Sequence, residues 1–332
     1  MRDVARAAQV SQSTVSRILS AGNGISVPIS AQTTKRVLET VAELGYQPNL
    51  HARSLRGQKT QMIAMMIADI ANPFYHIMVR RVQDIAREHG YDMLIANTDH
   101  DPEFERHFLD GIVRRPVDGV ILTPYHLNEH EIGRMMARTG VRVTVIGQHL
   151  QLPEVDRVFA DDGLATHDAV RWLIQERGHR RIAYLSVPGT VPSRRREAGY
   201  RSAMREAGLD VPDIYVQPGA FTPESGEAAT TFLLALPEPP TAIVACNDLM
   251  ALGCIEAANR VGVSVPEGLA VVGFDDIPEA RRTTPKLTTI AQFPAEMGGY
   301  MARALFERIN SEESFPARSY EVPCRLIVRE SA

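Results

Sequence analysis

The polar side chains near the amino terminus have the chemistry needed to read the edges of nucleic-acid bases. These residues are Gln12, Ser13, Ser16 and Arg17. A glutamine can form two hydrogen bonds with adenine, and an arginine can do the same with guanine. The hydroxyls of Ser11 and Thr14 can bind backbone phosphates at the start of a helix. The residue types therefore suit a DNA major groove, provided that one helix presents them together.

The apolar residues of the same segment predict such a helix. Val15, Ile18 and Leu19 recur at helical spacing, and Ser11 is a favourable N-cap for a helix that begins at Gln12. A shorter helix is predicted over residues 3–8, with an inner face of Val4, Ala7 and Ala8. The pair indicates a helix-turn-helix whose second helix enters the groove. An ordinary amphipathic helix pair with a polar face would show the same pattern.

The distribution of charge favours the DNA-binding interpretation. Residues 1–60 contain eight Lys and Arg against three Asp and Glu, a net charge of +5. The whole chain has a formal charge of −4, so the remaining 272 residues carry −9. A basic end on an acidic body is typical of a protein that contacts nucleic acid with one end only.

Longer motifs of a known family are spread along the chain. At the amino-terminal end they are Asp3-Val4-Ala5, Val10-Ser11, Ser13-Thr14-Val15-Ser16-Arg17, Leu44-Gly45-Tyr46, Pro48-Asn49 and Ala52-Arg53-Ser54-Leu55. In the body they are Ile70-Ala71-Asn72-Pro73-Phe74-Tyr75, Val117-Asp118-Gly119-Val120-Ile121, Arg177-Gly178-His179-Arg180-Arg181-Ile182-Ala183, Ala198-Gly199-Tyr200, Asn247-Asp248, Val272-Gly273-Phe274-Asp275-Asp276 and Leu287-Thr288-Thr289-Ile290. With these motifs the sequence resembles the lactose/purine/ribose repressor (LacI-GalR) family of bacterial transcription regulators, over essentially its whole length.

The resemblance implies specific DNA contacts. Gln12 and Ser13 would be the principal base readers, Arg17 a further groove contact, and Asn49 a backbone contact that leads into a hinge. Residues 49–56 would fold into a hinge helix only on operator DNA, where Leu55 from each of two subunits wedges into the central minor-groove step. Without the family, Leu55 would read as a half-buried linker residue. The predicted DNA-contacting set is Ser11, Gln12, Ser13, Thr14, Ser16, Arg17, Asn49, Arg53 and Leu55.

Two features of this end depart from the family pattern. The sequence has no short leading segment before Arg2-Asp3, and residues 21–28 form a longer connection than the usual one between the second and third helices. We expect the longer connection to be an inert loop.

The body alternates short apolar runs with amphipathic stretches, which predicts βαβ units and parallel sheets. Strands are expected at residues 62–67, 93–96, 120–122, 143–146, 182–185, 215–217, 242–245, 270–274 and 288–291. Helices are expected at residues 73–89, 102–114, 163–176, 193–207, 223–236 and 248–261. The predicted fold is thus an α-helical helix-turn-helix headpiece plus an α/β core of two doubly wound lobes. By resemblance, the core is similar to a periplasmic sugar-binding protein.

The predicted domains are a headpiece at residues 1–46, a hinge helix or linker at 47–59, and an effector-binding and dimerisation core at 60–332. The resemblance places chain crossovers near residues 160, 290 and 320. The first lobe would then contain about 60–160 and 291–320, and the second about 161–290 and 321–332.

Ligands of doubly wound sheets bind at the carboxyl ends of the strands, so the cleft between two such lobes is the expected ligand site. The family positions that touch an effector correspond to Phe74, Tyr75, Thr190, Arg196, Phe221, Asn247, Asp275 and Gln292. Aromatic faces stack on a sugar or a base, and the polar groups supply directed hydrogen bonds. Asn247 and Asp248 could equally begin a helix. A sugar-like effector is favoured and a purine is possible. Gly147 stands where many sugar-responsive members carry an acidic or polar residue, which weakens the case for any specific sugar.

Other functions have little support in the sequence. There is no GxSxG, GxGxxG, P-loop or HExxH motif, so we expect no enzyme, no cofactor and no metal. Glu103 and His107 are four residues apart, but Pro102 and the nearby acids suit ordinary helix initiation. Three cysteines without CxxC spacing indicate reduced packing residues.

The absence of a signal peptide or long apolar run predicts a cytoplasmic, nucleoid-associated protein. Its end lacks a leucine heptad, which favours a homodimer over a tetramer. The sequence therefore predicts a ligand-responsive repressor that binds palindromic DNA. The alternative is a small-molecule receptor of periplasmic-binding type without a gene-regulatory role.

Overall fold

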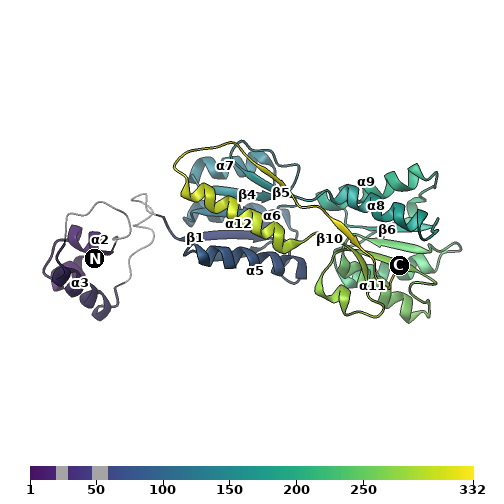
Figure 1. Ribbon diagram of the computed structural model, residues 1–332, viewed down its shortest axis with the longest axis horizontal. Coiled ribbons are helices and arrows are strands. Elements are labelled where there is room, and N and C mark those ends of the chain that lie inside the picture. The colour runs from purple at the N-terminus through teal and green to yellow at the C-terminus, as the bar shows by residue number, and fades with distance from the viewer. Residues whose placement is uncertain (20–28, 47–58) are drawn as a thin grey trace. The chain divides into compact units, whose positions relative to one another are not determined.

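The computed structural model describes residues 1–19, 29–46 and 59–332. The chain divides into two compact units, Met1–Thr60 and Gln61–Ala332 (Figure 1).

The first unit contains three helices in its described residues: α1 (Arg2–Ala7), α2 (Gln12–Leu19) and α3 (Ala31–Glu43). Their shared core includes Val4, Ala5, Ala8, Val15, Ile18 and Val37. The prediction for α1 was wrong at one position, because Ala7 is exposed and Ala5 is buried instead. A helix of six residues contains too few apolar positions to fix which face turns inward.

The second unit is built on two six-stranded sheets, which define two lobes. The first sheet has the order β11-β5-β4-β3-β1-β2. Its strands are β1 (Met62–Ile67), β2 (Asp92–Asn97), β3 (Gly119–Leu122), β4 (Arg142–Ile146), β5 (Asp156–Phe159) and β11 (Ser319–Glu321). Around it lie α5 (Pro73–Glu88), α6 (Pro102–Arg114), α7 (Glu129–Thr139) and α12 (Pro294–Asn310) (Figure 1). We call this part the N-lobe.

The second sheet has the order β12-β10-β9-β8-β6-β7. Its strands are β6 (Ile182–Ser186), β7 (Val216–Pro218), β8 (Ala242–Ala245), β9 (Ala270–Asp275), β10 (Thr288–Ala291) and β12 (Arg325–Ile327). Its helices are α8 (Asp162–Gln175), α9 (Val191–Glu206), α10 (Pro223–Leu234) and α11 (Asp248–Arg260), with short 3-10 turns at Asp213–Tyr215 and Pro278–Arg281. We call this part the C-lobe. Its strand β12 pairs antiparallel to β10, and every other pairing in the two sheets is parallel.

The chain passes between the lobes at three places. It leaves the N-lobe sheet after β5, returns from β10 to α12, and crosses again between β11 and β12. Helix α12 packs against α5 and against strands β3, β4 and β5, so a late segment of the chain completes the N-lobe. The predicted class, a helix-turn-helix headpiece with two doubly wound lobes, is confirmed.

Five elements were missing from the sequence-based expectation: β5, α7, α12, β11 and β12. Strand β5 contains Asp156 and Arg157, and charged residues conceal a short strand. Helix α7 did have a local signal, because Asn128 and Glu131 form a capping box at its start.

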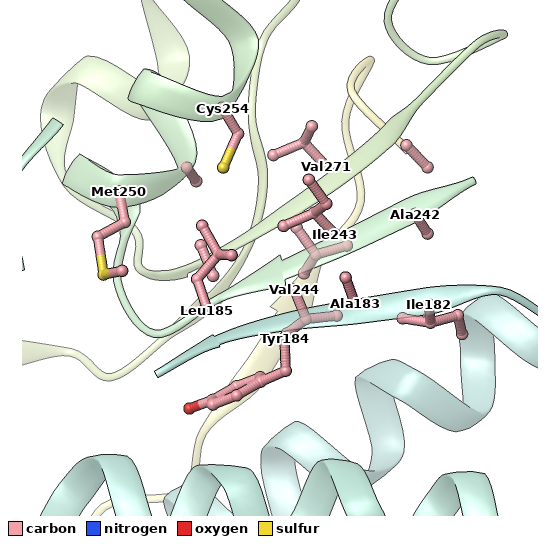
Figure 2. Packing of buried hydrophobic residues seen from close by; sticks show 14 of the residues in the cluster. Ile182, Ala183, Tyr184, Leu185, Ala242, Ile243, Val244, Met250, Cys254 and Val271 are labelled. Carbon is pink, nitrogen blue, oxygen red and sulfur yellow. The ribbon is translucent and has the colours of Figure 1, made fainter. Parts of the chain in front are cut away.

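The C-lobe core fixes the carboxyl ends of its strands. Figure 2 shows Tyr184 on one face of the sheet and Met250 and Cys254 of α11 on the other. Helices α10 and α11 pack so closely that a Cβ atom on Gly253 would overlap the Pro223 carbonyl oxygen. This close contact holds the loops that follow β7 and β8. In the described residues, no helix combines the length and apolar composition needed to cross a membrane.

Candidate functional site

The start of α2 presents an exposed polar surface. The Ser11 hydroxyl accepts a hydrogen bond from the Thr14 backbone N–H at 3.1 Å, which caps the helix, and it lies 2.8 Å from the Thr14 hydroxyl. Gln12, Ser13 and Arg17 are exposed, whereas Thr14 and Ser16 are half-buried. The sequence-predicted residues of α2 are thus brought together on one helix end. The predicted contacts Asn49, Arg53 and Leu55 lie outside the described residues.

A second candidate site is an open cavity between the N-lobe and the C-lobe, with about 660 Å³ of empty space that includes its open side. Its walls are the loops at the carboxyl ends of strands in both sheets, where doubly wound folds bind ligands. The N-lobe contributes Asn72, Phe74, Tyr75, Thr123, Pro124, Tyr125, Ile146, Gly147, Phe159, Ala160 and Met297. The C-lobe side contributes Asp162, Pro192, Arg195, Arg196, Phe221, Asp275 and Gln292.

Six of the eight residues predicted to contact an effector line this cavity: Phe74, Tyr75, Arg196, Phe221, Asp275 and Gln292. The structure does not bring Thr190 and Asn247 to it. The Thr190 hydroxyl donates to the Val187 carbonyl at 2.9 Å. Asn247 caps α11 by accepting from the Met250 N–H, and its amide donates to the Phe221 carbonyl at 3.1 Å. Asn247 therefore positions the Phe221 loop behind the cavity wall.

Arg196 is fixed by several partners. It is 5% exposed, its Nε lies 3.4 Å from Asp162 Oδ2, and an Nη atom donates to the Cys246 carbonyl at 2.5 Å. Its guanidinium lies 3.7 Å above the centre of the Phe274 ring. Arg195 binds the same Asp162 carboxylate through two hydrogen bonds of 2.7 and 3.1 Å. One carboxylate thus holds two arginines at the wall of the cavity.

Asp275 is the second buried carboxyl group at the cavity. Gln292 donates to its Oδ1 at 2.6 Å, and its backbone has a φ of 115°, in the region that favours glycine. Burial raises the pKa of the Asp275 carboxyl to about 6, although Arg196 and the Gln292 hydrogen bond act to lower it. Such a group can accept hydrogen bonds from ligand hydroxyls once it is ionised.

The shifted pKa of Asp275 gives a testable pH dependence of stability. Between pH 3.8 and about 6 the folded carboxyl retains a proton that the unfolded one has released. The stability contributed by Asp275 therefore falls as the pH rises through this window. We expect the difference in unfolding free energy between wild type and Asp275→Asn to decrease from pH 4 to about 6 and then level off, as measured by urea denaturation. A difference that grows with pH would contradict this.

Aromatic residues from both lobes line the cavity, and His100 packs against two of them. The Tyr75 and Tyr125 hydroxyls are 2.6 Å apart, so one of them donates a hydrogen bond to the other. Because burial raises the pKa of both, both stay protonated, and the second phenol proton remains for donation to a ligand. His100 stacks on Phe221 with ring centres 4.9 Å apart and meets Tyr125 edge-on at 4.7 Å. These rings offer flat apolar faces to a ligand.

Sequence reasoning missed Tyr125, Phe159 and Asp162 as cavity residues. Tyr125 follows strand β3 much as Phe74 follows β1, which was a usable signal. Its loop is held by Glu105, fully buried, which accepts hydrogen bonds from the N–H groups of residues 125, 126 and 127 at 2.8, 3.0 and 3.0 Å. Asp162 had no distinguishing signal, because an acid in the first turn of a helix is common.

The cavity wall combines aromatic faces with charged and polar groups. Two arginines face two carboxylates, so the cavity wall has balanced charge when Asp275 is ionised. Among the described residues, no cluster of three His, Cys, Asp or Glu side chains is arranged as a metal site.

Comparison with known proteins finds relatives that span the whole chain. Residues 1–49 match the bacterial regulatory proteins of the lacI family, and residues 173–332 match the periplasmic binding protein-like domain. Catabolite control protein A of Priestia megaterium is 34% identical over 331 residues, which covers 99% of this chain and 98% of that protein. The structure of the transcriptional regulator CelR-cellobiose complex is similar with a TM-score of 0.73 and 31% identity, covering 99% of this chain and 98% of that chain. The structure of the lac repressor dimer bound to operator and the anti-inducer ONPF is similar with a TM-score of 0.79 and 25% identity, covering 99% of this chain and 97% of that chain.

Proposed function

The chain belongs to the LacI family of ligand-gated transcription regulators, and we propose that it is a repressor whose operator affinity is set by a sugar or sugar derivative in the interlobe cavity. The observation that carries this proposal is the presence, in one chain, of an exposed recognition-helix surface and a polar, aromatic-rich cavity. Its relatives are transcription regulators, and we assign it no catalysis. A receptor without a regulatory role is not favoured, because residues 1–49 match a DNA-binding family.

The first test of the proposal is selection of genomic fragments by the purified full-length protein at physiological salt, where non-specific phosphate binding is weak. A two-fold symmetric dimer with one α2 in each half-site predicts enrichment of a palindrome. No enrichment with or without a panel of sugars and purines would argue against the DNA-binding assignment.

Arg17 is proposed to read a base in each half-site. Arg17→Ala should weaken specific binding by about 1–3 kcal/mol for each contact, counted twice in a dimer, and should relax the sequence preference. The measurement is a titration of selected and scrambled duplexes by fluorescence anisotropy. Arg180→Ala removes the same charge from an exposed site in the other unit and is the control. Equal weakening on both duplexes would reduce Arg17 to a phosphate contact.

Leu55 is proposed as the minor-groove wedge, on the basis of the family resemblance. Leu55→Ala should lose much of the specific affinity and little of the non-specific affinity, because only a specific site repays the energy of unstacking a base step. The same anisotropy titration measures both affinities. A parallel loss on specific and scrambled DNA would remove the wedge role.

The chemistry of the cavity supports a sugar-like ligand. Its balanced charges suit hydroxyl groups that donate to Asp275 and accept from Arg196, while Phe74 and Phe221 offer apolar faces. A similar structure contains cellobiose, which is a sugar. A purine remains the second candidate because its ring would stack on the same aromatic side chains.

Homodimer formation is supported by an apolar surface on the N-lobe. Leu94 and Ile95 of the edge strand β2 are 46% and 42% exposed, and Phe104 of α6 is 53% exposed. An exposed apolar edge strand is a surface that proteins normally cover with a partner. We propose that a second copy of the chain covers it.

A further inference from the structure

A second hollow adjoins the ligand cavity. It is an open groove with about 1040 Å³ of empty space, lined by residues 125–130 and 149–150 of the N-lobe and by Gly189, Val191 and Arg194 of the C-lobe. Tyr125 lines both the cavity and the groove. Pro192 and Arg195 in the cavity are chain neighbours of Val191 and Arg194 in the groove. The cavity and the groove therefore lie next to each other, with Tyr125 at their shared edge.

Of the three consecutive arginines of α9, Arg195 and Arg196 line the cavity and Arg194 lines the groove. Arg195 and Arg196 are both paired with Asp162, which belongs to the cavity. Arg194 is exposed, and it forms no ion pair with any carboxylate of the described residues. Its positive charge is thus left uncompensated on the wall of the groove.

His149 faces this charge from the N-lobe. Gly147 lines the cavity with a φ of 139°, and a Cβ atom there would lie 3.0 Å from Cε1 of the His149 ring. The imidazole therefore occupies the space that a side chain at position 147 would take, at the boundary between cavity and groove. Burial, Arg195 and Arg194 lower the pKa of His149, while Glu129 raises it. The neutral ring offers one N–H to a ligand.

The groove is richer in hydrogen-bond donors than in free acceptors. Glu129 accepts a hydrogen bond from the Gln151 N–H at 2.5 Å, and His126, His130 and His149 also line the walls. The difference from the cavity is that Arg195 and Arg196 are paired with Asp162 there, whereas Arg194 has no carboxylate partner in the described residues. A groove of this composition favours an anion.

We propose that the effector is an anionic sugar derivative, whose ring occupies the cavity and whose phosphate or carboxylate group binds in the groove against Arg194 and His149. The inference rests on the proposed function, because it extends the same effector site. It assigns Arg194 and His149 to ligand recognition, and neither belongs to the effector set predicted from the sequence. A guanidinium and an imidazole N–H both form charge-assisted hydrogen bonds with such anions.

The test uses matched ligand pairs and the full-length protein. Ribose with ribose 5-phosphate, glucose with glucose 6-phosphate, and glucose with glucuronate are titrated by calorimetry. At least one anionic member should bind about tenfold or more tightly than its neutral partner, the effect of one charge-assisted contact. Arg194→Gln should abolish this preference, and His149→Gln should reduce it. Arg205→Gln removes an exposed arginine from the other end of α9 and should leave the preference intact.

Each outcome decides the proposal. Tighter binding of the sugar phosphates would assign a phosphate group to the groove, and tighter binding of glucuronate would assign a carboxylate. Neutral sugars that bind as tightly as every anionic partner would overturn it, as would a preference that survives Arg194→Gln. If no sugar of the panel binds, the melting temperatures of wild type and Arg194→Gln are measured with and without inorganic phosphate. The proposal is overturned if phosphate raises the melting temperature of wild type no more than that of Arg194→Gln. Binding of a neutral sugar that depends on Arg196 would leave the proposed function standing without this extension.

Discussion

Replacing Asp156 by asparagine is expected to lower the free energy of unfolding by about 3–5 kcal/mol, the effect of breaking a buried ion pair on one side. Asp156 is fully buried and Arg308 is 3% exposed. Arg308 donates two hydrogen bonds to the carboxylate, at 2.8 and 2.6 Å, and Arg318 adds two more, at 2.7 and 3.1 Å. The carboxylate joins β5, α12 and the segment before β11. Its loss would leave the Arg308 charge buried and uncompensated.

The measurement is the free energy of unfolding of the second unit, obtained from its urea denaturation transition at neutral pH. Glu307→Gln is the matched control, because Glu307 pairs with the same Arg318 but its side chain is 57% exposed. Exposed pairs contribute about 0–1 kcal/mol. A cost below about 1 kcal/mol for Asp156→Asn would show that Arg308 finds water or another acceptor.

The pH dependence of this pair has the opposite sign to that of Asp275. Although burial acts to raise the pKa of Asp156, the hydrogen bonds from Arg308 and Arg318 lower it below 3.8. The stability from this carboxylate is therefore present above pH 3.8 and is lost as the pH falls through the lower folded value.

The second large effect is expected for Arg196→Met, which should weaken effector binding by about a hundredfold and leave DNA binding near that of wild type. Arg196 is the buried cation of the cavity, and methionine fills much of its volume while removing every donor. Asp162 keeps Arg195 as its partner, so the wall retains one ion pair.

The experiment compares ligand-induced melting shifts and release of selected DNA for wild type and variant. Arg201→Met is the control, because Arg201 lies on the same helix and pairs with Glu197 outside the cavity lining. An effector response that persists in Arg196→Met would place the ligand elsewhere. A variant that loses DNA binding as well would indicate misfolding, which circular dichroism would detect.

The sequence by itself determined the local elements of this protein. The helix that begins at Gln12 follows from the Ser11 cap and the spacing of Val15 and Ile18, which act within a few residues. The strands at 62–67 and 242–245 are apolar runs, and the structure has them with these bounds. Because ligand sites in parallel sheets lie at strand ends, those runs also indicated where the ligand cavity would lie.

Tertiary structure decided the pairings between distant parts of the chain. Arg308 and Asp156 are 152 residues apart, and no local pattern connects them. Three other contacts have the same origin. Asp162 binds both Arg195 and Arg196, the His149 ring lies beside Gly147, and the Asn247 amide donates to the Phe221 carbonyl. Helical and strand periodicity report only which face of an element is apolar. Which polar group a buried side chain meets depends on how the lobes fold together, so a burial or charge pattern along the chain does not contain it.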